Sequence, residues 1–97
     1  MEKRVYLNLL YDYYKDLFTI KQQEYFEDYY YNNLSLGEIA ENSNVSRNAV
    51  HNQLKIVENK LNEFEQILGL YKTKQQVLIL LKDKIDQELL EQIEQLM

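Results

Sequence analysis

Cysteine and proline are absent from this sequence, and glycine occurs only twice, at Gly37 and Gly69. Because there is no cysteine, the chain forms no disulfide and offers no thiolate for metal binding or redox chemistry. A β protein of many short strands needs turn residues at frequent intervals, and so few of them do not suffice. Glu, Lys, Gln and Leu, all good helix formers, dominate instead. The composition therefore predicts an all-α fold.

Long apolar runs are also missing. No stretch approaches the ~20 apolar residues of a membrane span. Charged residues interrupt the N-terminal segment, where a secretory signal needs an unbroken apolar run. At 97 residues the chain has the length of one domain. We therefore expect a cytoplasmic protein without membrane contact.

The residue types that carry most enzyme chemistry are scarce. His51 is the only histidine, so neither a histidine-based metal cluster nor a Cys–His or Ser–His pair has a basis. No glycine-rich phosphate loop is present. Carboxylate pairs at helical spacing, such as Asp12 and Asp16, are more simply explained as solvated helix faces. We expect no catalytic activity, no metal and no cofactor.

Tyrosine is abundant, with nine residues. Tyrosines can stack the bases of single-stranded nucleic acid, but such sites interleave them with basic residues. Here acidic side chains such as Asp12, Asp16 and Asp28 surround them. Helix packing with hydroxyls that reach water is therefore favoured, and a protein-docking patch is the alternative.

The charge is unevenly distributed along the chain. The net charge is −5, which argues against a protein that coats nucleic acid non-specifically. Residues 1–45 carry a net −4 and residues 75–97 a net −3, whereas residues 46–74 carry a net +2. The only positive stretch is the middle one.

Two helices are predicted in the first third of the chain. The first spans about Glu2 to Leu17. Thr19 and Gln22 form a capping box for a second helix at about Ile20 to Tyr31, which Asn32 and Asn33 end. On the first helix, steps of three and four residues place the following side chains on one face: Tyr6, Leu9, Leu10, Tyr13 and Leu17.

The segment SLGEIAENSNVSRNAVHNQL has the pattern of a helix-turn-helix, at about residues 35–55. Ser35 and Glu38 form a capping box for a short helix that ends near Asn42. Asn44 stands where the turn needs left-handed backbone, and Ser46 caps the next helix. Ala40 is small at the closest approach of the two helices. Three residues supply the apolar contacts, with Val45 pointing inward: Ile39, Val45 and Val50.

The second helix of this motif predicts a nucleic-acid-binding face. In helix-turn-helix proteins the early turns of this helix enter the major groove. Arg pairs with guanine, Asn pairs with adenine, and Lys holds phosphates. With Ala49, Val50 and Leu54 inward, the outward residues are Arg47, Asn48, His51, Asn52 and Lys55. A solvated polar face is the simpler alternative, because the set has only two full positive charges.

The same helix continues to Gly69, so it is predicted to be about 22 residues long. Its apolar residues step by four and three, as in a coiled-coil seam: Val50, Leu54, Val57, Leu61, Phe64 and Leu68. The rest of the chain is predicted to form one interrupted or two short helices, with a break near residues 82–84. That segment can cover the seam within the chain, or a homodimer can cover it; both alternatives stay open. Its apolar residues are Val77, Leu78, Leu81, Ile85, Leu89, Ile93 and Leu96.

The run from Phe18-Thr19 through the capping box at Ser35 to Val45-Ser46-Arg47-x-Ala49-Val50 resembles the fourth region of sigma factors. The whole chain resembles the YlxM family of small bacterial proteins, well over about residues 5–70. The resemblance implies a helix-turn-helix protein encoded beside the signal recognition particle GTPase, with a regulatory part in that pathway. It also implies signal recognition particle components as partners. His51 and Ile56 depart from the family pattern, in which tyrosine and a second basic residue are common.

Two hypotheses follow for a helix-turn-helix domain at residues 1–70 and a C-terminal helical extension at residues 71–97. In the first, the protein is a regulator that binds DNA or RNA through residues 46–55. In the second, it is an adaptor that docks to the signal recognition particle or its GTPase without sequence-specific DNA binding. We expect the extension to pack on the same core or to form a dimer interface.

Overall fold

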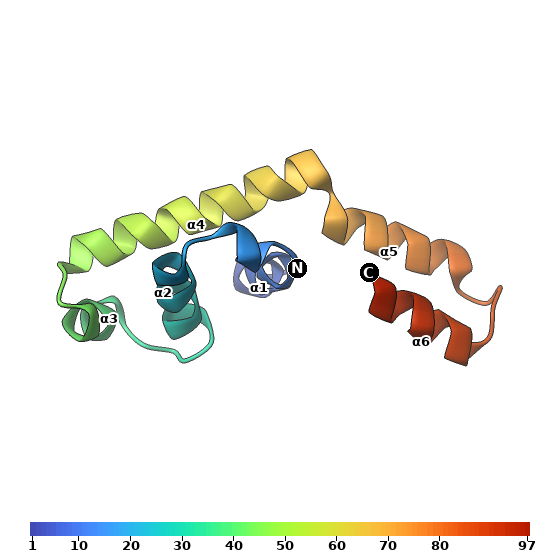
Figure 1. Cartoon of the computed structure of the whole chain (residues 1–97), viewed down its shortest axis with the longest axis horizontal. Helices are drawn as coiled ribbons and strands as arrows, with labels where there is room; N and C mark the ends of the chain where they lie inside the picture. Colours follow the sequence, from blue (N-terminus) through green and yellow to red (C-terminus); the bar gives the residue numbers. More distant parts are fainter.

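The longest helix, α4 (Arg47–Leu68), runs along one side of the molecule, and three shorter helices pack against it (Figure 1). The computed structural model describes residues 1–97 and contains no strand, which confirms the all-α prediction. The other elements are α1 (Lys3–Tyr14), a 3-10 turn η1 (Lys15–Leu17), α2 (Ile20–Tyr30), α3 (Leu36–Ser43), α5 (Leu70–Leu81) and α6 (Gln87–Leu96). None of these helices is both long and apolar enough to cross a membrane.

Side-chain caps fix where the central helices begin. The Thr19 hydroxyl accepts a hydrogen bond from the Gln22 N–H at 3.1 Å, and the Gln22 side chain accepts one from the Thr19 N–H at 3.1 Å. Ser35 and Glu38 form the same reciprocal pair, also at 3.1 Å. These capping boxes satisfy amide groups that have no partner within the helix. Both predicted capping boxes are confirmed.

The larger of two apolar clusters lies between α1, α2 and the second half of α4. At its centre Phe26 is fully buried, with its ring stacked on Tyr11 at 4.1 Å and on Tyr30 at 4.4 Å. Stacked aromatic pairs add to the free energy of burying their area. The buried members are Leu7, Leu10, Tyr11, Tyr14, Phe18, Phe26, Val57 and Leu61.

The buried face of α1 differs from the predicted one. The structure buries Leu7, Leu10, Tyr11 and Tyr14. Of the predicted residues only Leu10 is fully buried, and Leu17 is 57% exposed. Apolar residues surround most of this helix, so periodicity alone does not fix which face turns inward. The α-helix also ends at Tyr14, because the chain tightens into η1 before it turns toward α2.

The apolar seam of α4 packs against α1, α2 and α3 rather than against the C-terminal segment. Its first four members, from Val50 to Leu61, are buried, whereas Leu68 is 52% exposed. Neither of the two open alternatives, cover by the C-terminal segment or by a homodimer, describes these four buried residues, because α1–α3 already occupy that face. Periodicity identifies an apolar face but not the element that covers it.

A sharp bend joins α4 to α5. Gly69 adopts a left-handed backbone (φ 61°), which an L side chain rarely adopts, and so ends α4 as predicted. The Glu65 carboxylate accepts hydrogen bonds from the N–H groups of Tyr71 at 3.1 Å and Lys72 at 3.0 Å, which caps α5 from the preceding helix. The Tyr14 hydroxyl donates to Glu65 at 2.6 Å and accepts from the Leu70 N–H at 3.0 Å. These hydrogen bonds attach the bend between α4 and α5 to Tyr14 of the core.

Beyond the bend, α5 and α6 form a helical hairpin that projects from the rest of the chain (Figure 1). The predicted break is confirmed, with Asp83 in left-handed backbone (φ 66°) and Asp86 capping α6. No residue of either helix is buried. The protruding hairpin gives the molecule its elongated shape, 53 × 25 × 24 Å.

Candidate nucleic-acid interface

The crossing of α3 and α4 has the close approach that a helix-turn-helix requires. Ala40 is 6% exposed at the contact, and Ile39 and Val50 are fully buried beside it. A larger side chain than alanine at this contact forces the two helices apart. Tyr25 from α2 and Leu54 from α4 complete this second, smaller cluster. The cluster fixes α4 relative to α3 and α2.

The turn between the two helices is the tight one that the sequence predicts. Asn44 adopts left-handed backbone (φ 56°), and its N–H donates to the Glu41 carbonyl at 3.3 Å. The Val45 N–H donates to the Ala40 carbonyl at 3.1 Å. These bonds satisfy the last carbonyls of α3. One detail was wrong: Val45 is 39% exposed rather than inward, because Ile39 and Val50 already fill the space under the turn.

Ser46 starts α4 as predicted, because its hydroxyl accepts from the Ala49 N–H at 3.0 Å. The first two turns of α4 then present an open polar face. The five predicted site residues share this face and are exposed, and only Lys55 has an ion-pair partner within the chain. They are Arg47, Asn48, His51, Asn52 and Lys55. The face therefore holds hydrogen-bonding groups that are free to contact a ligand.

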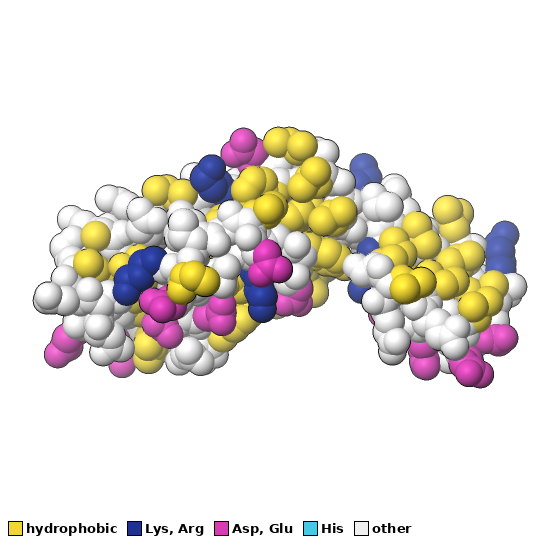
Figure 2. Space-filling model, viewed as in Figure 1, with side chains coloured by type: hydrophobic (Ala, Val, Ile, Leu, Met, Phe, Trp, Pro, Cys, Tyr) yellow, Lys and Arg dark blue, Asp and Glu magenta, His cyan; other side chains and the backbone are white.

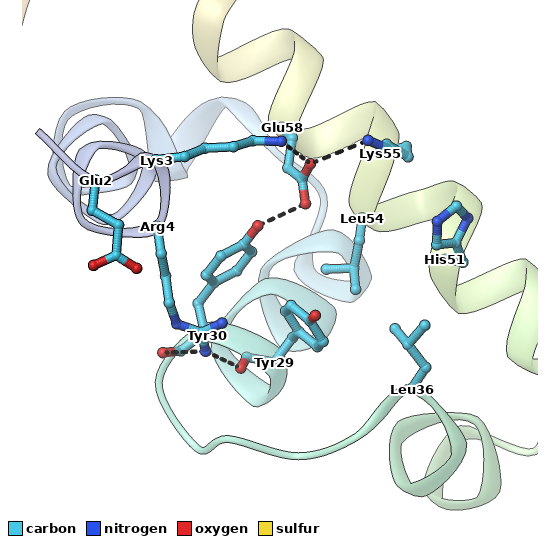
Figure 3. A pocket seen from close by; sticks show the side chains of 10 residues that line it. All are labelled: Glu2, Lys3, Arg4, Tyr29, Tyr30, Leu36, His51, Leu54, Lys55 and Glu58. Atoms are coloured by element: carbon cyan, nitrogen blue, oxygen red, sulfur yellow. Dashed lines mark hydrogen bonds and ion pairs between the residues drawn. The ribbon is translucent and has the colours of Figure 1, made fainter.

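A groove of about 450 Å³ borders this face, between α4, the C-terminal end of α2 and the N-terminal end of α1 (Figure 3). Glu58 lies at its far end. Its carboxylate accepts a 2.6 Å hydrogen bond from the Tyr30 hydroxyl and lies 4.0 Å from the Lys55 ammonium. The Lys3 ammonium lies 3.8 Å from the same carboxylate. Two exposed lysines from distant parts of the sequence therefore meet at one end of the face.

Arg4 stabilises the part of this groove that Tyr29 and Tyr30 form. Its guanidinium donates to the Tyr29 carbonyl at 2.8 Å and the Tyr30 carbonyl at 3.3 Å. It also lies over the Tyr30 ring, 4.7 Å from the centroid. Arg4 thus caps the carbonyl end of α2 and positions Tyr30 to reach Glu58 (Figure 3). Burial and the hydrogen bond to Glu58 raise the pKa of the Tyr30 hydroxyl.

Three cationic residues near the motif were not predicted as site residues from the sequence: Lys3, Arg4 and Lys21. Lys21 lies at the start of α2, with its ammonium 3.5 Å from the Ser43 hydroxyl at the end of α3. No spacing in the sequence connects these residues to α4, because only tertiary packing brings them together. By contrast α3 carries Glu38 and Glu41 and no cation. Hydrogen bonds from the backbone and hydroxyl of Ser35 lower the pKa of Glu38.

Comparison with known proteins agrees with this geometry. The family UPF0122, described as "Putative helix-turn-helix protein, YlxM / p13 like", matches residues 1–97. A UPF0122 protein of Geobacillus kaustophilus is 43% identical over 88 residues, which cover 88% of this chain and 80% of that protein. The chain belongs to the UPF0122 family. The YlxM resemblance seen in the sequence is thereby confirmed.

Other UPF0122 proteins match a similar length. One from Listeria welshimeri is 45% identical over 75 residues, which cover 77% of this chain and 68% of the relative. One from Halalkalibacterium halodurans is 38% identical over 91 residues, which cover 91% of this chain and 84% of the relative. UPF0122 is a family of helix-turn-helix proteins and is not defined by an enzymatic activity.

Proposed function

We propose that this protein is a non-catalytic regulator that binds nucleic acid by placing the first two turns of α4 in the major groove. One observation carries the proposal: α4 begins at a serine cap beside a tight turn, and its first turns expose Arg47, Asn48 and Asn52 without any side-chain partner in the chain. Arginine and asparagine make the commonest paired contacts with guanine and adenine. The fixed crossing with α3 holds these groups in one orientation.

Phosphate contacts supply a smaller share of the proposed affinity. Arg47 and Lys55 are the two full charges on the face, and Lys3 adds a third at its edge. Each neutralised phosphate contributes about 0.9 to the slope of log affinity against log salt concentration. We therefore expect modest non-specific binding, and base contacts account for most of the selectivity.

A fluorescence titration with mixed-sequence duplexes at two salt concentrations tests the proposal. We expect the affinity to fall with salt, with a slope that drops by about 1 in Lys55→Ala. Arg47→Ala and Asn48→Ala will change the preferred sequence, each at a cost of about 1–3 kcal/mol in discrimination. Lys15→Ala, which removes an exposed charge on η1 away from the face, is the matched control. Unchanged preference in both α4 variants contradicts the proposal.

The setting we propose is cytoplasmic regulation in the signal recognition particle pathway. It is supported only by the resemblance of the motif to the YlxM family. Titration of purified signal recognition particle RNA and, separately, of its GTPase tests this setting. Binding to either at micromolar concentration supports it, and binding to neither contradicts it.

A competing hypothesis is an adaptor that docks to the signal recognition particle or its GTPase without sequence-specific DNA binding. The acidic first 45 residues, with a net charge of −4, favour it because they complement a basic partner and repel nucleic acid. This hypothesis predicts that Arg47→Ala leaves the affinity for the GTPase unchanged. The same variant weakens nucleic-acid binding under the main proposal, so one substitution separates the two.

We also propose that the protein acts as a homodimer. Two copies double the few phosphate contacts that each α4 face offers, and a two-fold axis presents two such faces to neighbouring half-sites. The expected target is therefore a sequence with two related halves. A single half-site bound as tightly as the pair contradicts this part of the proposal.

A further inference from the structure

The hairpin of α5 and α6 has no core of its own. Residues 77–81 (VLILL) are all aliphatic, so they cover every side of the helix. Within this run Ile79 is 71% exposed and Leu80 is 68% exposed. Helices of 12 and 10 residues are marginally stable in water unless an apolar face is packed. The hairpin therefore needs a cover that a single chain does not provide.

The base of the hairpin is firmly attached to the core. Besides the Glu65 cap, the Tyr71 ring makes edge contacts with Tyr6 at 5.8 Å and with Tyr13 at 6.2 Å between centroids. The direction in which α5 leaves the core is therefore fixed. The hairpin projects away from the core (Figure 1), and Ile79 and Leu80 on it stay exposed.

The hairpin presents an apolar face with charged borders. Figure 2 shows hydrophobic side chains gathered over α5 and α6, lysines toward α5 and the tip, and carboxylates along α6. A groove of about 680 Å³ continues this surface into the angle between α4 and α5. Exposed aliphatic residues of this region are Ile67, Leu68, Leu70, Ile79, Leu80, Leu89 and Leu96.

The two arms of the hairpin carry opposite charge. Residues 70–84 contain four lysines and one aspartate, whereas residues 85–97 contain four acidic residues and no basic one. The three ion pairs of the chain all lie within residues 3–58, so none joins the two arms. Lys74 lies over the Tyr13 ring and Asp86 caps α6. The other charges have no ion-pair partner and can pair with another surface.

We infer that this face is the interface with a second copy of the chain, in which α5 of each copy lies against α6 of the other. A partner of one charge sign complements one arm and repels the other, whereas a second copy complements both. In such a two-fold arrangement the four helices pack around the 77–81 aliphatic run and cover it. The inference rests on the homodimer proposed above and does not depend on nucleic-acid binding.

Light scattering of the full chain without nucleic acid, from micromolar to millimolar concentration, tests the interface. We expect twice the chain mass of 11.8 kDa. The double variant Ile79→Gln, Leu80→Gln will weaken the dimer at least about a hundredfold, since burying each aliphatic side chain contributes roughly a tenfold factor or more. Ile20→Gln on α2 is the matched control, because Ile20 is also 71% exposed and lies outside the hairpin.

Charge-reversal variants give a second, independent test of the dimer interface. We expect Lys72→Glu with Lys84→Glu to weaken the dimer at least about tenfold, and Glu91→Lys with Glu94→Lys to do the same, since two-fold symmetry counts each pair twice. An equimolar mixture of the two variants will restore dimers that contain one chain of each kind. Circular dichroism verifies that every variant keeps its helices.

Two outcomes overturn the inference. A wild-type mass of one chain at every concentration contradicts both the dimer and its interface. A dimer that neither set of hairpin variants weakens keeps the dimer but contradicts this interface. Because no nucleic acid is present, failure of the nucleic-acid proposal leaves these masses unchanged.

Discussion

The first 68 residues and the hairpin that follows them use similar helix-forming residues but bury them very differently. All 13 buried residues of the chain lie between Leu7 and Leu61, and none lies in α5 or α6. In the first region three helices pack against α4, and two of them, α1 and α2, enclose aromatic rings against it. In the second, two short helices leave their aliphatic side chains half-exposed or exposed. The comparison separates a region with a buried core from an extension that buries no residue.

The difference also separates the two proposed roles. Recognition of nucleic acid requires a face of fixed geometry, which the buried crossing of α3 and α4 provides. Association of two copies requires an apolar face that is free in the single chain, which the hairpin provides. The first region is suited to recognition because its helix crossing is buried, and the hairpin is suited to association because its apolar side chains are not.

The largest effect is expected from a truncation in the aromatic centre of the first region. Phe26→Ala will lower the free energy of unfolding by about 3–5 kcal/mol, because it leaves a cavity between two stacked rings. Urea unfolding followed by circular dichroism measures it. Ile79→Ala, studied at concentrations too low for association, will change the stability by less than about 0.5 kcal/mol. Equal losses of unfolding free energy in Phe26→Ala and Ile79→Ala would contradict this difference between the two regions.

A smaller effect is expected at the junction between the regions. Tyr14→Phe removes one hydrogen bond to Glu65 and one from the Leu70 N–H, at a cost of about 1–3 kcal/mol. Hydrogen exchange of the Leu70, Tyr71 and Lys72 amides will accelerate more than exchange in α3. Tyr13→Phe, whose hydroxyl makes no hydrogen bond within the chain, is the control. Uniform acceleration throughout the chain would contradict a local role for Tyr14.

The same junction predicts a pH dependence. Burial and the hydrogen bond to Glu65 raise the pKa of Tyr14 from 10.0 to about 12. A hydroxyl whose pKa is raised on folding adds stability that is fully present below pH 10 and is lost as the pH rises from about 10 to 12. Wild type will therefore lose more stability than Tyr14→Phe across this interval. Parallel curves for the two proteins would argue against the raised pKa.

The smallest effect concerns the start of α4. Ser46→Ala removes the cap on the Ala49 N–H and will cost about 1 kcal/mol. Loss of the cap will loosen the first turn of α4, so nucleic-acid affinity is expected to fall while the hairpin keeps its protection in hydrogen exchange. Ser35→Ala, which removes an equivalent cap on α3, tests whether the loss of affinity is particular to α4.

Local features of the fold were predictable from the sequence because each depends on a few neighbouring residues. The caps at Thr19, Ser35 and Ser46, the left-handed turn at Asn44 and the end of α4 at Gly69 are all confirmed. Each is a hydrogen bond or a backbone conformation within one turn of helix. The position of the exposed face at the start of α4 follows from these features.

Features that depend on tertiary contact were not predictable. The buried face of α1 was wrong because aromatic and aliphatic residues surround that helix. The tyrosine hydroxyls were expected to reach water, but those of Tyr11, Tyr14 and Tyr30 donate to carboxylates on other elements. Likewise Lys3 lies beside Lys55 only because α1 packs on α4. The spacing of residues along the sequence does not indicate such pairings.

Mapping of amide chemical shifts during titration with a duplex that carries the preferred sequence tests the central claim most directly. The account predicts that shifts concentrate in Asn44 to Lys55 and at Lys3, with the amides of α5 and α6 unchanged. Shifts confined to the hairpin, or no shift in the first two turns of α4 at saturating duplex, would contradict it.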